Sequence, residues 1–228
     1  KGYQVVLASG PTYGPEGEIE SLARKLQVDV RIIPELVREI SPFQDLIAFF
    51  KVNALIRKEK FDIVHTHTSK AGIIGRVAAK LPGVPVVVHT PHGHIFYNYF
   101  SNLKTKIFCL LEMISAKFCD KIITLTDHCK LEHVKFRVAA EDKFITIPSG
   151  VRLEKFSGSF CDQDNLKESL KIPQSRKIAG TVARLEPIKG IEHFIEAARK
   201  VLDKQPETHF LIVGDGSQKE YLQAKSKV

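Results

Sequence analysis

Short apolar runs alternate along the chain with longer segments of helical spacing. Eight runs rich in Val, Ile and Leu predict β-strands at residues 3–8, 28–33, 62–66, 84–90, 121–126, 144–147, 178–183 and 209–213. Apolar residues spaced three and four apart predict helices around 19–26, 46–56, 107–118 and 194–202. Because the strands are apolar and the helices amphipathic, we expect an α/β fold with parallel sheets covered on both faces.

The alternation is interrupted once, after Val151. A polar segment that includes Ser157-Gly-Ser and Asp162-Gln-Asp-Asn follows, and the pattern restarts at Lys177. This break predicts two domains, residues 1–152 and 153–228. The first would hold six strands, enough for a doubly wound sheet, and the second two. Ligands of such sheets bind beyond the carboxyl ends of the strands, so residues at those ends are the candidates for function.

The strand at 178–183 leads into the segment Gly180-Thr-Val-Ala-Arg-Leu-Glu-Pro-Ile-Lys-Gly190, which places Arg184 and Lys189 just before a predicted helix. A helix start offers unpaired N–H groups and the positive end of a dipole, so the segment favours binding of an anion such as a diphosphate. In the alternative interpretation Arg184 pairs with Glu186 and Lys189 is merely solvated. A second strand-to-helix turn contains Gly214, a weaker candidate for the same ligand.

Histidines mark two further strand ends. His65 and His67 lie two residues apart on one strand, so both side chains point to the same side. They either face a substrate, or one is buried against a backbone partner and the other solvated. At the next strand end Pro91 and Gly93 bracket His92 in a tight backbone that would present its imidazole.

The neighbours of His92 leave more alternatives open. His89 and His94 are equally consistent with a structural and a functional role, and three imidazoles within six residues are unusual as core filling. A neutral imidazole can accept a hydrogen bond from a substrate hydroxyl at physiological pH. The aromatic run 96–100 fits either loop-anchoring core or the lining of an acceptor site.

Five short motifs together resemble the retaining glycosyltransferases of family 4, which have the GT-B fold. They are Asp62-Ile-Val-His65-Thr-His67, Thr90-Pro-His92-Gly93, Ile147-Pro-Ser-Gly-Val151, Gly180 to Gly190, and Val213-Gly-Asp-Gly216. The version at residues 90–97 is similar to members that assemble capsule, exopolysaccharide or other envelope glycans. Each motif alone is weak, and their order and intervals carry the resemblance.

The resemblance implies two facing Rossmann-like domains, one nearly complete and one only begun, with acceptor held by the first and nucleotide-sugar donor by the second. It implies that Arg184 and Lys189 neutralise the donor diphosphate as it leaves, without a bound metal or other cofactor. His92 would lie near the donor sugar, with Gly190 and Gly214 on the donor side and His65, His67 and His94 on the acceptor side. Transfer would proceed with retention, from a nucleotide-diphosphate hexose to a glycan or lipid-linked acceptor.

The chain also departs from the family pattern. Residues 149–152 read Ser-Gly-Val-Arg where the family usually has Asn-Gly-Val-Asp, and Lys1 to Ala8 matches the second strand of the family. The acidic pair of the family would fall beyond Val228. We therefore expect a chain truncated at both ends and inactive by itself.

Two alternatives are enzymes of other classes. A metal-dependent hydrolase could use His65 and His67 with His92 or His94, because paired histidines bind zinc, although it would leave Arg184 and Lys189 unexplained. A sugar-nucleotide 2-epimerase of the same fold would instead form product without an acceptor.

Composition narrows the possible partners. With 34 Lys+Arg against 26 Asp+Glu the net charge is +8, which favours an anionic partner. The cations are scattered and no aromatic residues interleave with them, which argues against nucleic acid. Without an apolar run of eighteen residues or a signal peptide, we expect a cytoplasmic protein. The four cysteines lie ten or more residues apart, which favours free thiols. Basic residues around the apolar stripes of 104–137 suggest peripheral contact with the inner membrane surface, or simply a solvated basic face.

Overall fold

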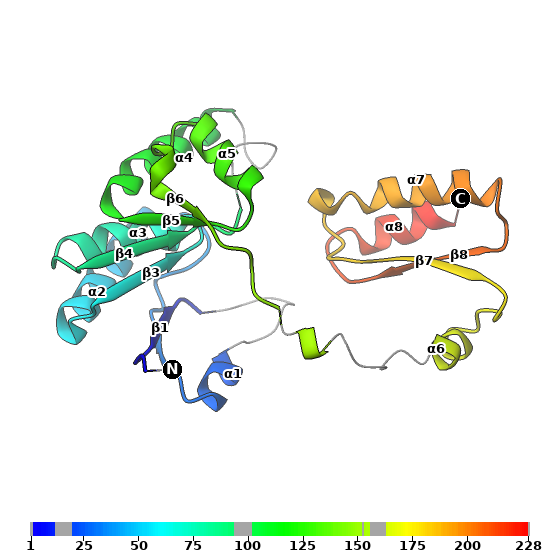
Figure 1. Ribbon diagram of the computed structural model, residues 1–228, viewed down its shortest axis with the longest axis horizontal. Coiled ribbons are helices and arrows are strands. Elements are labelled where there is room, and N and C mark those ends of the chain that lie inside the picture. The colour runs from blue at the N-terminus through cyan, green and yellow to red at the C-terminus, as the bar shows by residue number, and fades with distance from the viewer. Residues whose placement is uncertain (1, 12–19, 94–101, 152, 156–162, 228) are drawn as a thin grey trace. The chain divides into compact units, whose positions relative to one another are not determined.

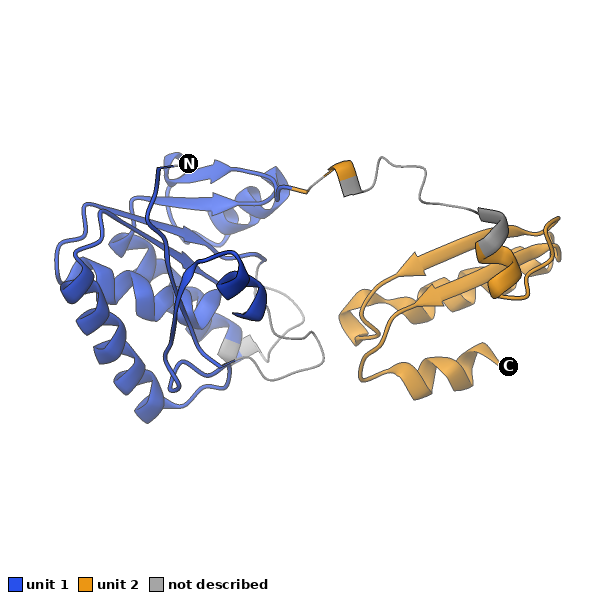
Figure 2. Ribbon diagram, turned by 90° about the horizontal axis from the view of Figure 1, so that it is seen from below, with its two compact units in different colours: residues 1–150 blue, residues 151–228 orange. Residues whose placement is uncertain are grey.

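The computed structural model divides into two compact units, Lys1–Gly150 and Val151–Val228 (Figure 2). It describes residues 2–11, 20–93, 102–151, 153–155 and 163–227. All eight strands predicted from the sequence are present, and every strand pair is parallel. The prediction of an α/β fold is therefore confirmed.

The first unit alternates strands and helices (Figure 1). Its strands are β1 (Val6–Ser9), β2 (Asp29–Ile32), β3 (Ile63–His67), β4 (Val86–Thr90), β5 (Lys121–Thr124) and β6 (Phe144–Thr146). Its helices are α1 (Glu20–Lys25), α2 (Pro42–Glu59), α3 (Ser69–Lys80), α4 (Asn102–Ser115) and α5 (Asp127–Lys135). Two 3₁₀ turns, η1 (Ala116–Phe118) and η2 (Glu141–Lys143), precede β5 and β6.

The six strands of this unit do not form the single doubly wound sheet that the sequence suggested. They lie in two parallel sheets, β1-β2 and β3-β4-β5-β6.

One face of the four-stranded sheet is covered, and the expectation that both would be is wrong for the described residues. Strands β3 to β6 follow one another in chain order, so right-handed crossovers bring their connecting helices to the same face. On the other face the side chains of Ile63, Val86 and Ile145 remain 51, 40 and 43% exposed. The core lies on the covered face, where Val87, Ile122 and Phe144 pack with Ala78 and Ala79.

Helix α3 approaches this sheet closely because small residues form its inner face. A Cβ at Gly72 would lie 2.4 Å from Cε1 of His89, and one at Gly75 would lie 2.7 Å from Cγ2 of Thr66. The two glycines therefore allow α3 to rest directly on β3 and β4, and so help fix the ends of these strands.

The second unit is smaller. It contains η3 (Leu153–Lys155), α6 (Gln163–Ser169), β7 (Lys177–Val182), η4 (Pro187–Lys189), α7 (Ile191–Leu202), β8 (Thr208–Val213) and α8 (Lys219–Ser226). Strands β7 and β8 pair in parallel over six residues each. The core of this unit is formed by Leu185, Ile191, Ile195 and Leu222.

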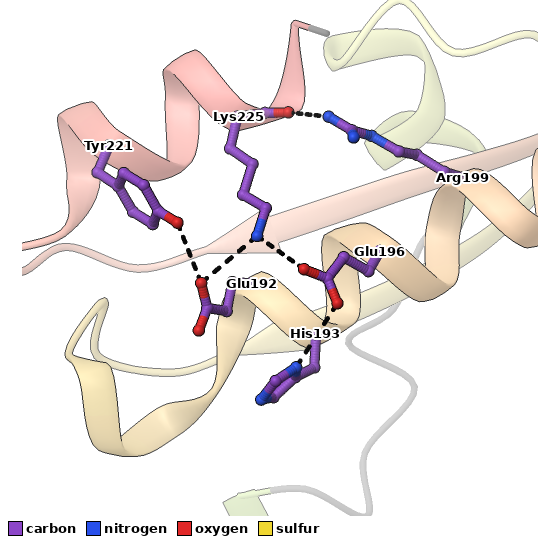
Figure 3. A network of polar contacts seen from close by, with 6 residues as sticks. All are labelled: Glu192, His193, Glu196, Arg199, Tyr221 and Lys225. Carbon is purple, nitrogen blue, oxygen red and sulfur yellow. Dashed lines mark hydrogen bonds and ion pairs between the residues drawn. The ribbon is translucent and has the colours of Figure 1, made fainter.

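A polar network joins helices α7 and α8 (Figure 3). Lys225 Nζ lies 2.8 Å from Glu196 Oε1 and 3.4 Å from Glu192 Oε2, and the Tyr221 hydroxyl donates to the same Glu192 oxygen at 3.1 Å. Glu192 stands in the first turn of α7, and its carboxylate faces α8. The network thus holds α8 against α7, the helix that follows the candidate anion-binding segment from Arg184 to Gly190.

Candidate functional site

Two histidines of β3 lie side by side at its carboxyl end. His65 and His67 point to the same side of the strand, as the sequence predicted, and their ring centroids are 4.2 Å apart. Thr66, between them, points to the covered face and is buried. Because β3 pairs with β4 in register, His67 stands opposite Thr90 and next to the turn that follows β4.

That turn brings His92 to His67. The two rings are stacked with centroids 5.1 Å apart, and His67 Nδ1 lies 2.8 Å from His92 Nε2. One of these nitrogens must carry the shared hydrogen and the other a lone pair, so the two rings are not both charged. His92 has a left-handed backbone with φ of 59°, which is uncommon for a residue other than glycine and fits the tight turn expected there.

Thr90 supports the same cluster. Its Oγ1 lies 2.8 Å from Nε2 of His65, and its carbonyl accepts a hydrogen bond of 3.1 Å from the backbone N–H of Thr68. This role of Thr90 was not predicted from the sequence. The available signal was its place in the Thr-Pro-His-Gly motif. Thr90 ends the strand next to β3, and in the parallel pair it stands opposite His67.

The two imidazoles on β3, His65 and His67, are held neutral at physiological pH. Partial burial of the ring, followed by the charges of His65 and His92, lowers the pKa of His67 to about 4. Partial burial, followed by the charge of His92, also lowers the pKa of His65. Neutral rings can accept hydrogen bonds from hydroxyl groups.

His89 plays a different part. Its ring is 1% exposed and lies on the covered face, where Nδ1 is 2.9 Å from Thr66 Oγ1. Burial, followed by the charge of Arg76, lowers its pKa to about 2. Of the two interpretations left open by the sequence, this geometry supports the structural one. His94 and the aromatic run 96–100 lie outside the described residues.

In the second unit, the Gly180 to Gly190 segment forms the strand, loop and helix that the sequence predicted. The loop leaves β7 with Arg184 and ends in the turn η4, whose last residue is Lys189, and both side chains are exposed. Gly190 has φ of 60° and is the N-cap of α7. The first turn of α7 therefore directs its N–H groups and positive dipole end toward this loop.

The glycine turn after β8 packs against the same loop. A Cβ at Gly214 would lie 1.9 Å from the carbonyl oxygen of Ala183, so only glycine fits there. The N–H of Leu185 donates to the carbonyl of Asp215 at 2.8 Å, and that of Gln218 donates to the carbonyl of Leu185 at 2.9 Å. The two turns that the sequence suggested separately therefore pack together in the structure.

Glu186 strengthens this junction, a contact that the sequence analysis missed. Its carboxylate accepts hydrogen bonds from the hydroxyl and N–H of Ser217, at 2.7 and 3.1 Å. These bonds, and the charge of Arg184, lower the pKa of Glu186. The carboxylate of Glu186 therefore faces the glycine turn, and it also interacts electrostatically with Arg184.

The histidine cluster forms no recognisable metal centre within the part of the chain that the structure describes. There, no three His, Cys, Asp or Glu side chains are grouped so that they could hold a metal ion. Within the same residues no helix has the length and hydropathy needed to cross a bilayer.

Two family models match this chain. "Glycosyltransferase Family 4" matches residues 1–155, which is most of the chain, and "Glycosyl transferases group 1" matches residues 162–227. The motifs quoted from the sequence fall within these two ranges.

Two curated relatives illustrate the similarity. UDP-Gal:alpha-D-GlcNAc-diphosphoundecaprenol alpha-1,3-galactosyltransferase of Escherichia coli is 38% identical over 81% of this chain and 48% of its own length. The capsular polysaccharide biosynthesis glycosyltransferase CapM of Staphylococcus aureus is 27% identical over 87% of this chain and 57% of its own. The chain therefore spans about half the length of the relatives it matches.

A solved structure confirms the fold. Anabaena HepE in complex with UDP has a TM-score of 0.74, with 17% identity, 96% of this chain covered and 57% of HepE. At that identity the likeness shows the GT-B fold alone.

Proposed function

We propose that this chain, which belongs to glycosyltransferase family 4, is part of an enzyme that transfers a sugar from a nucleotide-diphosphate donor to a glycan or lipid-linked acceptor. The observation that carries the proposal is the loop after β7, where two exposed cations stand before a helix start and a glycine turn closes the loop from β8. The Escherichia coli relative supports it, since its name gives a UDP-sugar donor and a lipid-diphosphate acceptor.

The donor side of the proposed site is the loop of the second unit. Arg184 and Lys189 would bind the diphosphate and stabilise the charge that develops on it as the bond to the sugar breaks. The N–H groups near Gly190 would add to this field, and the tight packing at Gly214 would let the backbone approach the ligand. Because these groups supply the positive charge, we propose transfer without a metal or other cofactor.

The acceptor side is the histidine cluster of the first unit. His92 would help to position the donor sugar and the incoming hydroxyl, with His65 and His67 beside it. Neutral imidazoles at His65 and His67 suit this role, because they accept a hydroxyl hydrogen bond without binding an anion of their own. We propose hexosyl transfer with retention, as in the family that the motifs resemble.

The proposal includes the place of action. An enzyme with a lipid-linked acceptor must reach a membrane surface, and we propose that this one does so from the cytoplasmic side as a peripheral protein. Its assignment to capsule or other envelope glycans is supported by the name of the Staphylococcus aureus relative.

The test is a transfer assay on the full-length protein, supplied with UDP-hexoses and with lipid-linked or oligosaccharide acceptors. We expect an α-linked product from an α-linked donor. We also expect a loss of at least about a hundredfold in kcat/KM for both Arg184→Ala and Lys189→Ala, because each removes charge stabilisation from the leaving group. Lys200→Ala, an exposed lysine on α7 away from the loop, is the matched control. Unchanged donor turnover in both loop variants would refute the assignment.

The same assay separates the alternatives. A 2-epimerase would convert the donor sugar without any acceptor, so a product formed only when acceptor is present argues against it. A metal-dependent hydrolase would lose activity with a chelator and regain it with zinc, whereas the proposed transferase would keep full activity.

A further inference from the structure

Helix α4 turns its apolar residues outward. Leu103, Ile107, Leu110, Leu111 and Ile114 share one side of the helix, and their exposures are 70, 50, 54, 38 and 44%. A surface helix of a globular protein normally buries such a stripe. This one buries polar residues instead, and Glu112 on its inner side is paired with Arg76 at 2.8 Å. Within the described residues of this unit, the stripe is therefore largely exposed.

A shallow groove continues the exposed stripe. Its volume is about 420 Å³, and Leu110, Met113 and Ile114 of α4 form one wall while Val138, Ala139 and Ala140 form the other. The groove joins the helix surface to the segment between α5 and β6, so the apolar area is wider than one helix.

The groove also carries cations. Lys117, Arg137 and Lys143 line it, and no acidic residue does. Arg137 has a left-handed backbone with φ of 57°, and its side chain is exposed. Lys106, on α4 itself, is exposed as well. Apolar side chains with cations among them match the interfacial region of an anionic bilayer, where headgroups meet acyl chains.

The position of this surface leaves the histidine cluster free. The groove is bordered by η1 and Lys143 of η2, the turns that lead into β5 and β6. It therefore lies at the amino ends of the strands, whereas His65, His67 and His92 lie at the carboxyl ends of β3 and β4. Because the strands are parallel, these are opposite ends of the sheet, and an occupant of the groove would not cover the cluster.

We propose that the outer side of α4 and this groove together dock the protein onto a membrane surface containing anionic phospholipid. The inference rests on the proposed function for its partner, since an enzyme with a lipid-linked acceptor needs contact with a membrane, but membrane binding can be measured without donor or acceptor. Leu110 and Ile114 enter the boundary between headgroups and acyl chains, and Lys117 and Arg137 contact lipid phosphates. The α4 surface lies in the interface and does not span the bilayer.

Vesicle co-sedimentation tests the electrostatic part. With vesicles of 40% phosphatidylglycerol in phosphatidylcholine, Lys117→Glu with Arg137→Glu should weaken binding by at least about thirtyfold, since each of the two lost cations contributes about 1 kcal/mol near an anionic surface, about 1.4 kcal/mol is tenfold, and the new carboxylates add repulsion. The control Lys58→Glu with Lys80→Glu makes the same change in net charge at exposed sites of α2 and α3. It should bind like wild type, whereas an equal loss in both pairs would show only attraction by net charge and overturn the assignment to α4.

Fluorescence tests the apolar part. The chain contains no tryptophan, so Ile114→Trp introduces a single probe on the stripe. Its emission should shift to the blue with these vesicles and be quenched by lipids brominated on the acyl chain. Leu81→Trp, at a residue 60% exposed after α3, should show neither change. An unshifted emission spectrum of the Ile114→Trp variant with bound vesicles would refute insertion at this face.

Two further measurements keep the outcomes distinct. If the stripe instead joins two copies of the chain, Leu110→Ser with Ile114→Ser would convert a dimer into a monomer in sedimentation without changing vesicle binding, and the proposal would be wrong. Arg184→Ala should bind vesicles like wild type. Failure of the transferase proposal would therefore not affect the vesicle-binding result, and failure of vesicle binding would not affect the transfer assay.

Discussion

The buried imidazole of His89 predicts a measurable dependence of stability on pH. The ring is 1% exposed, and its pKa is lowered to about 2, chiefly by burial. In the unfolded chain the pKa returns to the ordinary value of about 6.5. Above that value the ring is neutral in both states, and below it the unfolded state binds a proton that the folded state does not. The contribution to stability is therefore complete above pH 6.5 and is lost progressively as the pH falls toward 2.

The magnitude follows from the size of the shift. Each pH unit below the unfolded pKa costs about 1.4 kcal/mol, so lowering the pH from 7 to 5 removes about 2 kcal/mol through this group alone. In His89→Asn the amide can still bond to Thr66 but does not titrate. The free energy of unfolding of the variant should accordingly fall by about 2 kcal/mol less than that of the wild type over the same interval.

The assay is urea unfolding at pH 7 and pH 5 followed by far-ultraviolet circular dichroism, because the chain has no tryptophan. His128→Asn, a change at an exposed histidine of α5, is the control and should keep the wild-type dependence. The same fall in stability for His89→Asn and wild type would show that His89 does not stay neutral in the folded protein, and the reasoning would fail.

Two other predictions concern packing. Gly214→Ala should destabilise the second unit by roughly 1–3 kcal/mol, because its Cβ would lie 1.9 Å from a backbone oxygen; thermal unfolding measures this, and Gly150→Ala, with nothing within 4 Å, should have no such effect. Arg76→Leu should cost about 3–5 kcal/mol, since it leaves Glu112 buried without its partner, and adding Glu112→Leu should recover most of that loss. A double-mutant cycle by urea unfolding checks the second prediction, and additive losses would contradict it.

The strands could be predicted from the sequence because their signal is local. Runs such as Val86-Val-Val and Ile178-Ala are apolar and short, and both form strands in the structure. Helix α3 was not predicted, because its buried residues are Gly72, Gly75, Arg76 and two alanines, which do not form a hydrophobic stripe. Close packing on a sheet requires small residues. The same small residues that let α3 approach the sheet therefore do not give the apolar spacing that predicts a helix.

Individual residues of the candidate site could be predicted from the sequence, but the contacts between them could not. Alternation along β3 places His65 and His67 on one side, and the structure confirms this. The contact between His67 and His92 depends on the register of two strands and on a left-handed residue, neither of which a local pattern specifies. The expectation that both sheet faces are covered failed for a similar reason, since coverage depends on which helices follow which strands.

The orientation of α4 could not be predicted from the sequence either. The spacing of Ile107, Leu110 and Ile114 predicted a helix correctly, but it could not tell whether the stripe points into the core or away from it. The buried pair of Arg76 and Glu112 occupies the inner side, and that long-range contact decides the orientation.

The central claim is that the loop from Arg184 to Gly190 binds the donor diphosphate, and titration of UDP into the full-length protein by calorimetry tests it most directly. A hydrogen bond to a charged group contributes about 1.5–3 kcal/mol, so Arg184→Ala and Lys189→Ala should each weaken UDP binding at least tenfold. Lys200→Ala should bind UDP like wild type. If both loop variants bind UDP as tightly as the wild type does, the loop is not the diphosphate site and the account is contradicted.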